Sequence, residues 1–205
     1  MSGSTSTGGS GFRTDFDFTT LVVIAGMTAV LFAGGLGLIG FYEIPPDIDF
    51  KPFFIVYAVI FFVPWGTPTI ASALGATAAE GLLDLIEGAG PDDPFGWVGY
   101  AIGFTVFGWM TKNAEHDEWL RLGVAATVAA FLQIAIEGIA FLIVEGKAVS
   151  FYATVVSANT VTHGVIMGAI LLPPTLSALQ GRVEEAFGAA MEGNSSSTGS
   201  AGTAD

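Results

Sequence analysis

Long apolar stretches alternate with short polar segments along most of this chain. Many of these stretches approach the roughly 20 residues that an α-helix needs to cross about 30 Å of hydrocarbon. Prolines and glycines cluster at the joints between them, where they favour turns over helix. The pattern predicts an all-α membrane protein, a bundle of six transmembrane helices at residues 18–41, 51–64, 67–87, 95–111, 119–145 and 150–174.

Two of these predicted helices have unusual boundaries. The second, at 51–64, is short for a membrane span, so it has to tilt little, lie where the bilayer is thin, or use residues of the following turn. The sixth is expected to end at Pro173-Pro174, because proline lacks the N–H that continues a helix.

Composition supports an integral membrane protein with one compact domain. Hydrophobic residues make up 52% of the chain and charged residues 12%, unlike an ordinary soluble domain. The two ends are instead rich in glycine, serine and threonine, which predicts mobile tails. We expect a disordered N-terminal tail over 1–17, a six-helix membrane domain over 18–180, and a cytoplasmic, largely disordered C-terminal tail over 181–205.

The formal net charge of −13 is unusual for a membrane protein. Most acidic side chains, Asp49 among them, fall in predicted loops and ends, where water would hydrate them. Concentrated salt screens such charge, so the composition is typical of a halophilic organism with an acidic proteome. Nucleic acid is not an expected partner of so acidic a chain.

The few basic residues predict the orientation in the membrane. With the N-terminus in the cytoplasm, four basic residues lie inside and two outside: Arg13, Lys112, Arg121 and Arg182 against Lys51 and Lys147. Basic residues are more frequent in cytoplasmic loops. The bias therefore predicts a multi-pass protein of the cell membrane with both termini cytoplasmic.

Polar side chains recur at helical spacing in the fifth and sixth predicted helices. Gln133 and Glu137 are four residues apart, and Tyr152, Asn159 and His163 follow one stripe of the next helix. A carboxylate inside a membrane span costs about 2.5–3.5 kcal/mol, so Glu137 is expected to face a cavity or a polar partner such as His163. The stripes predict either a ligand site or hydrogen bonds that tie the two helices together.

The third predicted helix carries three carboxylates toward its C-terminal end. Glu87 and Asp84 are expected at the outer mouth of the bundle, where water hydrates them. Glu80 lies deeper in the span, so it is expected to brace the bundle or to line a cavity.

A stripe of small side chains, Ala25, Ala29 and Ala33, recurs at every fourth position of the first predicted helix. Such a stripe lets another helix approach closely. It is interpreted either as packing within the chain or as a docking surface for another protein.

Motifs of enzymes and metal sites are missing from the sequence. There is no cysteine, no G-x-S-x-G, no P-loop, and no second zinc-binding histidine in the HDEW sequence at 116–119. We therefore expect no enzymatic activity, no cofactor and no bound metal.

Residues 18–180 together resemble the S components, the substrate-binding membrane subunits of energy-coupling factor transporters. The resemblance rests on AGMTAVLFA in the first helix, on the second and third helices joined at FVPWG, on PFGWVGYAIGFTVFGWM in the fourth, and on the six-helix order with its loop lengths. Two features depart from the family: Phe62-Val63-Pro64 stands where Phe-Gly-Pro is common, and the first helix has additional glycines at Gly34 and Gly35.

The resemblance implies a subunit that captures a vitamin or related micronutrient on the outer side of the membrane. It also implies docking, through the small-residue stripe, to a transmembrane coupling protein that works with two ATPase subunits. The side chains expected at the ligand are Tyr42, Glu43, Trp97, Tyr100, Gln133, Glu137, Tyr152, Asn159 and His163. Acids and aromatic rings with almost no basic residue nearby would suit a cationic heteroaromatic vitamin.

Other classes of protein fit the same residues. A stand-alone ion- or proton-coupled carrier would use Glu80, Glu137 and His163 as a relay. An intramembrane enzyme would need His163 and a carboxylate for acid–base chemistry, but no nucleophile or metal triad is visible. A purely structural subunit would use the polar positions only to hold helices together.

Overall fold

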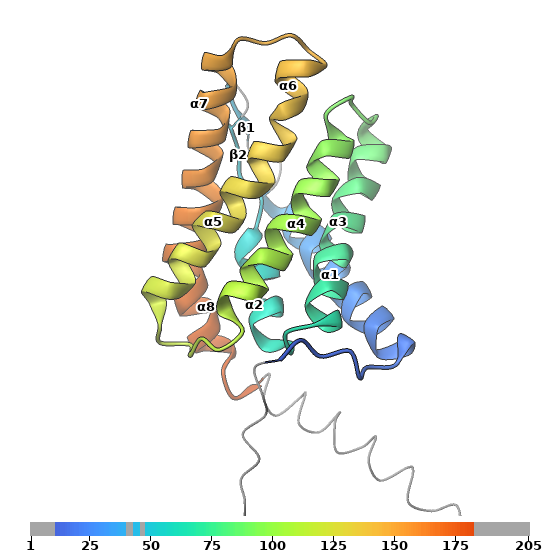
Figure 1. Ribbon diagram of the computed structural model, residues 1–205, viewed down its shortest axis with the longest axis vertical. Helices are drawn as coiled ribbons and strands as arrows, with labels where there is room; N and C mark the ends of the chain where they lie inside the picture. Colours follow the sequence, from blue (N-terminus) through green and yellow to red (C-terminus); the bar gives the residue numbers. More distant parts are fainter. Residues whose placement is uncertain (1–10, 40–42, 46–47, 183–205) are drawn as a thin grey trace, which may run out of the picture.

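The computed structural model describes residues 11–39, 43–45 and 48–182, and this part of the chain is mostly helical (Figure 1). The helical elements are α1 (Phe18–Ile39), α2 (Phe53–Phe62), α3 (Thr67–Glu87), α4 (Asp93–Thr111), α5 (Trp119–Glu137), α6 (Ile139–Ile143), α7 (Val149–Asn159), the π-helical segment η1 (Thr160–Leu171) and α8 (Leu172–Leu179). A short antiparallel hairpin, β1 (Glu43–Ile44) with β2 (Ile48–Asp49), lies between α1 and α2 in the sequence. The predicted all-α class is confirmed.

Four helical segments of the described residues are long and apolar enough to cross a membrane: Phe18–Ile39, Thr67–Glu87, Trp119–Ile143 and Val149–Leu179. The third of these joins α5 to α6, and the fourth is one continuous rod of α7, η1 and α8. By contrast, α2 has ten residues, which rise only about 15 Å. The length and composition of the four segments indicate an integral membrane protein.

Helix boundaries agree with the predicted ones to within a few residues except at the C-terminal end. The last rod does not stop at Pro173-Pro174 but continues to Leu179. The two prolines follow the π-helical segment and occupy the first turn of α8, where a missing N–H is tolerated. The predicted end was wrong because proline interrupts a helix only where its N–H is needed.

The bundle has two distinct ends (Figure 1). The two ends of the described chain lie at the same end of the bundle as the α2–α3 turn and the α4–α5 connection. The α3–α4 and α6–α7 turns lie at the other end, and the hairpin lies toward that end between the helices. The chain thus places a strand pair inside one half of the bundle.

Residues 11–17, part of the predicted N-terminal tail, pack against the α2–α3 turn. The Arg13 N–H donates to the Trp65 carbonyl at 3.0 Å, and the Arg13 carbonyl accepts from the Thr67 N–H at 2.9 Å. Gly66 between them has a φ of 141°, and a Cβ there would lie 2.0 Å from the Arg13 carbonyl oxygen. Only glycine fits this crossing. The remaining tail residues, 1–10 and 183–205, lie outside the described part of the chain.

Close approach of helix backbones holds the long helices together. A Cβ at Gly75 of α3 would lie 2.1 Å from the Ala25 carbonyl oxygen of α1. In the same way, a Cβ at Gly99 of α4 would lie 2.5 Å from the Gln133 carbonyl oxygen of α5. These glycines bring α3 against α1 and bring α4 against α5, the helix that carries Gln133 and Glu137.

Aromatic side chains fill the centre of the bundle. The Phe53 ring lies edge-on to Phe104, with 5.0 Å between the ring centroids, and stacks on His163 at 4.3 Å. Tyr57, fully buried, donates its hydroxyl hydrogen to the Ala126 carbonyl at 3.0 Å. The aromatic core therefore directly adjoins a group of polar side chains.

Candidate functional site

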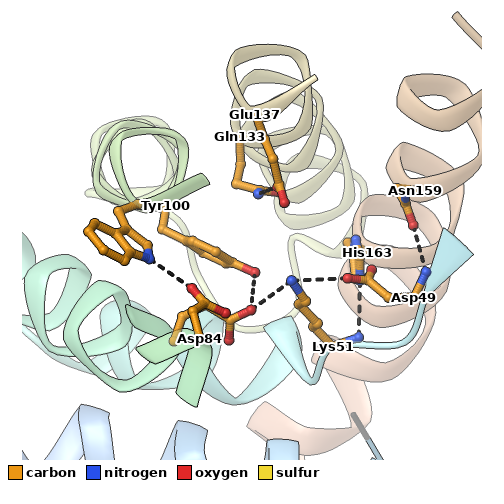
Figure 2. Close-up of polar contacts among 10 residues, drawn as sticks. Asp49, Lys51, Asp84, Tyr100, Gln133, Glu137, Asn159 and His163 are labelled. Carbon is orange, nitrogen blue, oxygen red and sulfur yellow. Dashed lines mark hydrogen bonds and ion pairs between the residues drawn. The ribbon is translucent and has the colours of Figure 1, made fainter. Parts of the chain in front are cut away.

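Polar and charged side chains gather inside the bundle beneath the hairpin, and we call them the buried polar cluster (Figure 2). They come from β2, the residues that follow it, and helices α3, α4, α5, α7 and η1. The members are Asp49, Lys51, Glu80, Tyr100, Gln133, Glu137, Asn159 and His163. Side chains from one strand and four separate helical segments thus converge on one site.

The ammonium group of Lys51 lies at the centre of the cluster. Its Nζ is 2.6 Å from Glu80 Oε1 and 3.0 Å from Asp49 Oδ2. The Tyr100 ring centroid lies 5.5 Å from the same nitrogen, and the Tyr100 hydroxyl donates to Glu80 Oε1 at 3.2 Å. One cation is therefore held by two carboxylates and an aromatic ring.

Electrostatic attraction in the cluster outweighs the cost of burial. Burial by itself lowers the pKa of Lys51, but attraction to Asp49 and Glu80 raises this pKa well above its usual value. Burial by itself raises the pKa of Asp49, but attraction to Lys51 lowers this pKa below its usual range. Both groups are charged at neutral pH.

Side chains of the last helical rod hold residues 48–51, which comprise β2 with Asp49 and the two residues that follow it, the second being Lys51; we call this segment the strand. The Asp49 N–H donates to Asn159 Oδ1 at 3.1 Å, and the Lys51 N–H donates to His163 Nε2 at 3.0 Å. The two N–H groups are two residues apart in an extended chain and so face the same way. Asn159 and His163 are four residues apart and so share one helical face. The matched spacing secures this strand to the bundle.

His163 has a second neighbour, because its Nε2 also lies 3.0 Å from Asp49 Oδ1. Nε2 can accept a hydrogen bond from the Lys51 N–H only when Nε2 itself carries no hydrogen. It can donate a hydrogen bond to Asp49 only when it does carry one. Only one of the two contacts is a hydrogen bond at a time. The His163 side chain is 2% exposed, and its Nδ1 is buried with no hydrogen-bond partner among the described residues.

Gln133 and Glu137 complete the cluster from α5. Gln133 Nε2 donates to Glu137 Oε2 one helical turn away. Gly96 of α4 leaves room for this carboxyl group, since a Cβ there would lie 3.3 Å from Glu137 Cδ. A cavity of about 20 Å³ lies between these side chains, the strand and His163. That volume suffices for a water molecule but not for a vitamin.

The cluster holds more hydrogen-bond acceptors than donors. Glu80 Oε2 and Gln133 Oε1 are buried and have no hydrogen-bond donor in the part of the chain that the structure describes, and Asp49 Oδ1 has one only when His163 Nε2 carries a hydrogen. The carboxyl groups of Asp49, Glu80 and Glu137 also share their surroundings with one ammonium group. An occupant that brings N–H donors or positive charge would satisfy these oxygens.

Five of the predicted ligand residues meet in this cluster: Tyr100, Gln133, Glu137, Asn159 and His163. Trp97 instead faces α3, where its Nε1 donates to Asp84 Oδ2 at 2.8 Å and its ring lies against Gly81. Asp84 is thus hydrogen-bonded within the bundle rather than simply hydrated.

Two other predicted residues lie around the cluster. The Tyr152 ring lies against Gly138 at the junction of α5 and α6, and its hydroxyl donates to the Ala135 carbonyl at 3.4 Å. Glu43 pairs with Asp49 through the hairpin backbone. The Glu43 side chain and the whole of Tyr42 lie outside the described residues.

The sequence interpretation missed Asp49 and Lys51 as site residues. It treated Asp49 as a hydrated loop acid and counted Lys51 only as a basic residue on the outer side of the membrane, whereas the structure places both in the buried polar cluster. A signal was present: Lys51 is one of only six basic residues, stands two positions after Asp49, and is followed by Pro52 and an apolar helix. Glu80 lies in the cluster, in agreement with its predicted depth.

The alanine stripe of α1 is partly buried. Ala25 lies against Gly75 of α3, and Ala29 and Ala33 pack at the edge of the aromatic core. The opposite side of α1 is exposed at Gly26, Gly34 and Gly37, where no atom lies within 4 Å of the position of a Cβ. Much of the predicted stripe therefore contributes to packing inside the bundle.

Comparison of the chain with protein-family models, with curated proteins and with solved structures found no match.

Proposed function

We propose that this protein is the substrate-capture subunit of an energy-coupling factor type importer, and that it binds a vitamin or related micronutrient at the buried polar cluster. The observation that carries the proposal is the convergence of charged, amide and aromatic side chains under a hairpin at one end of a membrane bundle. Ligand sites typically combine aromatic surface with a few convergent polar groups. The resemblance of residues 18–180 to S components supplies the partner proteins.

Ligand binding in this proposal requires the strand that carries Asp49 and Lys51 to move. The cavity of about 20 Å³ has no room for a vitamin while the strand is in place. Movement breaks the two hydrogen bonds to Asn159 and His163 and the ion pair to Glu80. Polar groups of the helices then become available to the ligand, which repays the cost of opening.

For the membrane topology, we propose six crossing segments, both termini in the cytoplasm, and the polar cluster in the outer half. Lys51 is ion-paired inside the bundle, so only Lys147 remains outside against the four inner basic residues. Single cysteines introduced at Asp92 and Lys147 are expected to react with an impermeant maleimide added to intact cells. A cysteine at Asn113 is expected to react only after lysis, and the reverse pattern would place the cluster on the cytoplasmic side.

The importer function predicts what this chain carries when it is purified gently from its own membranes. Native mass spectrometry is expected to show a retained small molecule, and co-purification is expected to show a transmembrane coupling protein with two ATPase subunits. A Glu137→Gln variant is expected to retain that molecule about ten- to a hundredfold more weakly, since it loses a charge-assisted hydrogen bond of about 1.5–3 kcal/mol.

A matched control for Glu137 is Glu118→Gln, because Glu118 lies in the turn before α5 and pairs only with Arg121 among the described residues. Unchanged retention by a folded Glu137→Gln variant would remove Glu137 from the site. Absence of both a retained molecule and the partner subunits would contradict the importer function. Uptake by proteoliposomes that contain this chain alone would instead support the alternative, a stand-alone carrier.

A further inference from the structure

We infer that the Lys51 ammonium occupies a position built for the positively charged group of the ligand, so that the substrate class is a small organic cation bearing an ammonium or another protonated nitrogen. This inference rests on the proposed function, because it names the ligand class of the same site. Three observations carry it: the surroundings of the ammonium, the unsatisfied acceptors, and the place of Lys51 in the chain.

The surroundings of the Lys51 ammonium come mostly from helices that do not move with it. Glu80 of α3 lies 2.6 Å from Nζ, and the Tyr100 ring of α4 presents its face at 5.5 Å. Both residues are almost completely buried, with exposed fractions of 5% for Glu80 and 1% for Tyr100. A carboxylate and an aromatic face are the groups that recognise organic ammonium ions.

The acceptors that Lys51 leaves unsatisfied belong to helices α3 and α5, which stay in place when the strand opens. Glu80 Oε2 and Gln133 Oε1 are buried without a donor among the described residues, and Gln133 lines the cavity next to Lys51. The lysine ammonium has three N–H groups, and two of them face Asp49 and Glu80. A ligand with additional N–H groups would satisfy these oxygens, whereas an anion would add to the excess of acceptors.

Because Lys51 belongs to the strand that opens, the ligand has to supply the positive charge that Lys51 takes away. Opening the strand removes Lys51 together with Asp49, and it leaves Glu80 and Glu137 in the bundle. The other basic residues lie near the ends of the described chain, in the connections between helices, or in the first turn of α5: Arg13 and Arg182, Lys112 and Lys147, and Arg121. A neutral ligand would leave the Glu80 carboxylate buried without its cation, which is strongly unfavourable. A cationic ligand replaces the ammonium that it displaces.

The Lys51 side chain competes with the ligand for the position next to Glu80 and so weakens the apparent affinity for the ligand. Lys51 is held near Glu80 by a short chain segment, and such tethers give effective concentrations of about millimolar or higher. Only the fraction of molecules with the site vacated can bind an external cation. Removal of the lysine side chain is therefore expected to raise the affinity for a small cation by about tenfold or more.

The test uses the purified full-length chain in detergent, with methylammonium chloride as the probe. Methylammonium replaces sodium in steps at constant ionic strength, and the thermal unfolding midpoint is recorded. Lys51→Ala is expected to show saturable stabilisation at concentrations about tenfold or more below those that the wild type needs. Lys147→Ala is the matched control, because Lys147 is 47% exposed and lies on the α6–α7 turn, and it is expected to behave like the wild type.

A second variant tests the receiving carboxylate. Lys51→Ala combined with Glu80→Gln is expected to show no saturable response to methylammonium, and acetamide, a neutral probe of similar size, is expected to have no effect on either variant. A folded Lys51→Ala protein that responds no more strongly than the wild type overturns the inference. If Lys51→Ala folds only when methylammonium is present, the inference is supported.

If Lys51→Ala does not fold either with or without methylammonium, a measurement on the wild-type protein tests the inference instead. Methylammonium is then expected to accelerate hydrogen exchange at the Asp49 and Lys51 amides, and unchanged exchange at saturating methylammonium overturns the inference. The result is separable from the importer function. If the purified protein retains a neutral or anionic compound together with the partner subunits, only the inference of a cationic ligand is overturned. If methylammonium binds but neither a retained compound nor partner subunits are found, only the importer function is overturned.

Discussion

Replacement of Lys51 by methionine is expected to destabilise the folded protein by about 3–5 kcal/mol. Methionine is similar in length but leaves the Asp49 and Glu80 carboxylates without their shared cation. The Glu80 side chain is only 7% exposed, so water cannot replace the lost ammonium. The measurement is the free energy of unfolding in mixed micelles, obtained from a denaturing-detergent titration at constant salt.

Two further variants separate charge from packing at Lys51. Lys147→Met removes a lysine of the outer turn that lies 3.6 Å from Glu145, and a loss of less than about 1 kcal/mol is expected. Lys51→Met combined with Glu80→Gln is expected to be more stable than Lys51→Met alone, because no uncompensated carboxylate remains at position 80. Equal stabilities of the single and double variants would show that the Lys51–Glu80 pair carries no coupling.

Gly75→Ala is expected to destabilise the bundle by about 1–3 kcal/mol. The added methyl group would lie 2.1 Å from the Ala25 carbonyl oxygen and 2.8 Å from its carbonyl carbon, so α1 and α3 have to move apart. Backbone atoms of a helix cannot swing aside as the end of a flexible side chain can. The same unfolding titration measures the loss.

The control for Gly75 is the same substitution on the exposed side of the neighbouring helix. Gly26→Ala meets no atom within 4 Å, and alanine in a helix interior is favoured over glycine by roughly 0.5–1 kcal/mol. The two variants are therefore expected to change stability in opposite directions. If Gly75→Ala were as stable as Gly26→Ala, the close contact between α1 and α3 would not hold in the membrane protein.

The hairpin and the residues that follow it matter for the proposed function because they bring a positive charge into the bundle. The strand is not merely a loop over the bundle, because it supplies the cation that compensates Glu80. It also supplies two N–H groups to Asn159 and His163. Opening this strand and binding a ligand are thereby coupled, since both act on the same side chains.

The positions of the long helices could be predicted from the sequence alone. The thickness of the hydrocarbon sets the length of a membrane-spanning helix, and local composition predicts where an apolar stretch such as 67–87 begins and ends. Helical spacing likewise placed Gln133 with Glu137, and Asn159 with His163, on shared faces. The cost of polar groups in a membrane identified these four as inward-facing, and the structure places all of them in the buried polar cluster.

The tertiary structure alone decided what those side chains contact. Asn159 and His163 bind backbone groups that are 110 and 112 residues away in the chain, a relation that no local pattern encodes. Lys51 and Asp49 lie in a short segment without helical or extended periodicity, so their burial depends entirely on how the hairpin packs between helices. Trp97 and the alanine stripe turned toward neighbouring helices because Gly81 and Gly75 leave space there. Hydrophobic pattern determines which segments lie in the membrane, whereas close packing between distant segments determines which charges meet.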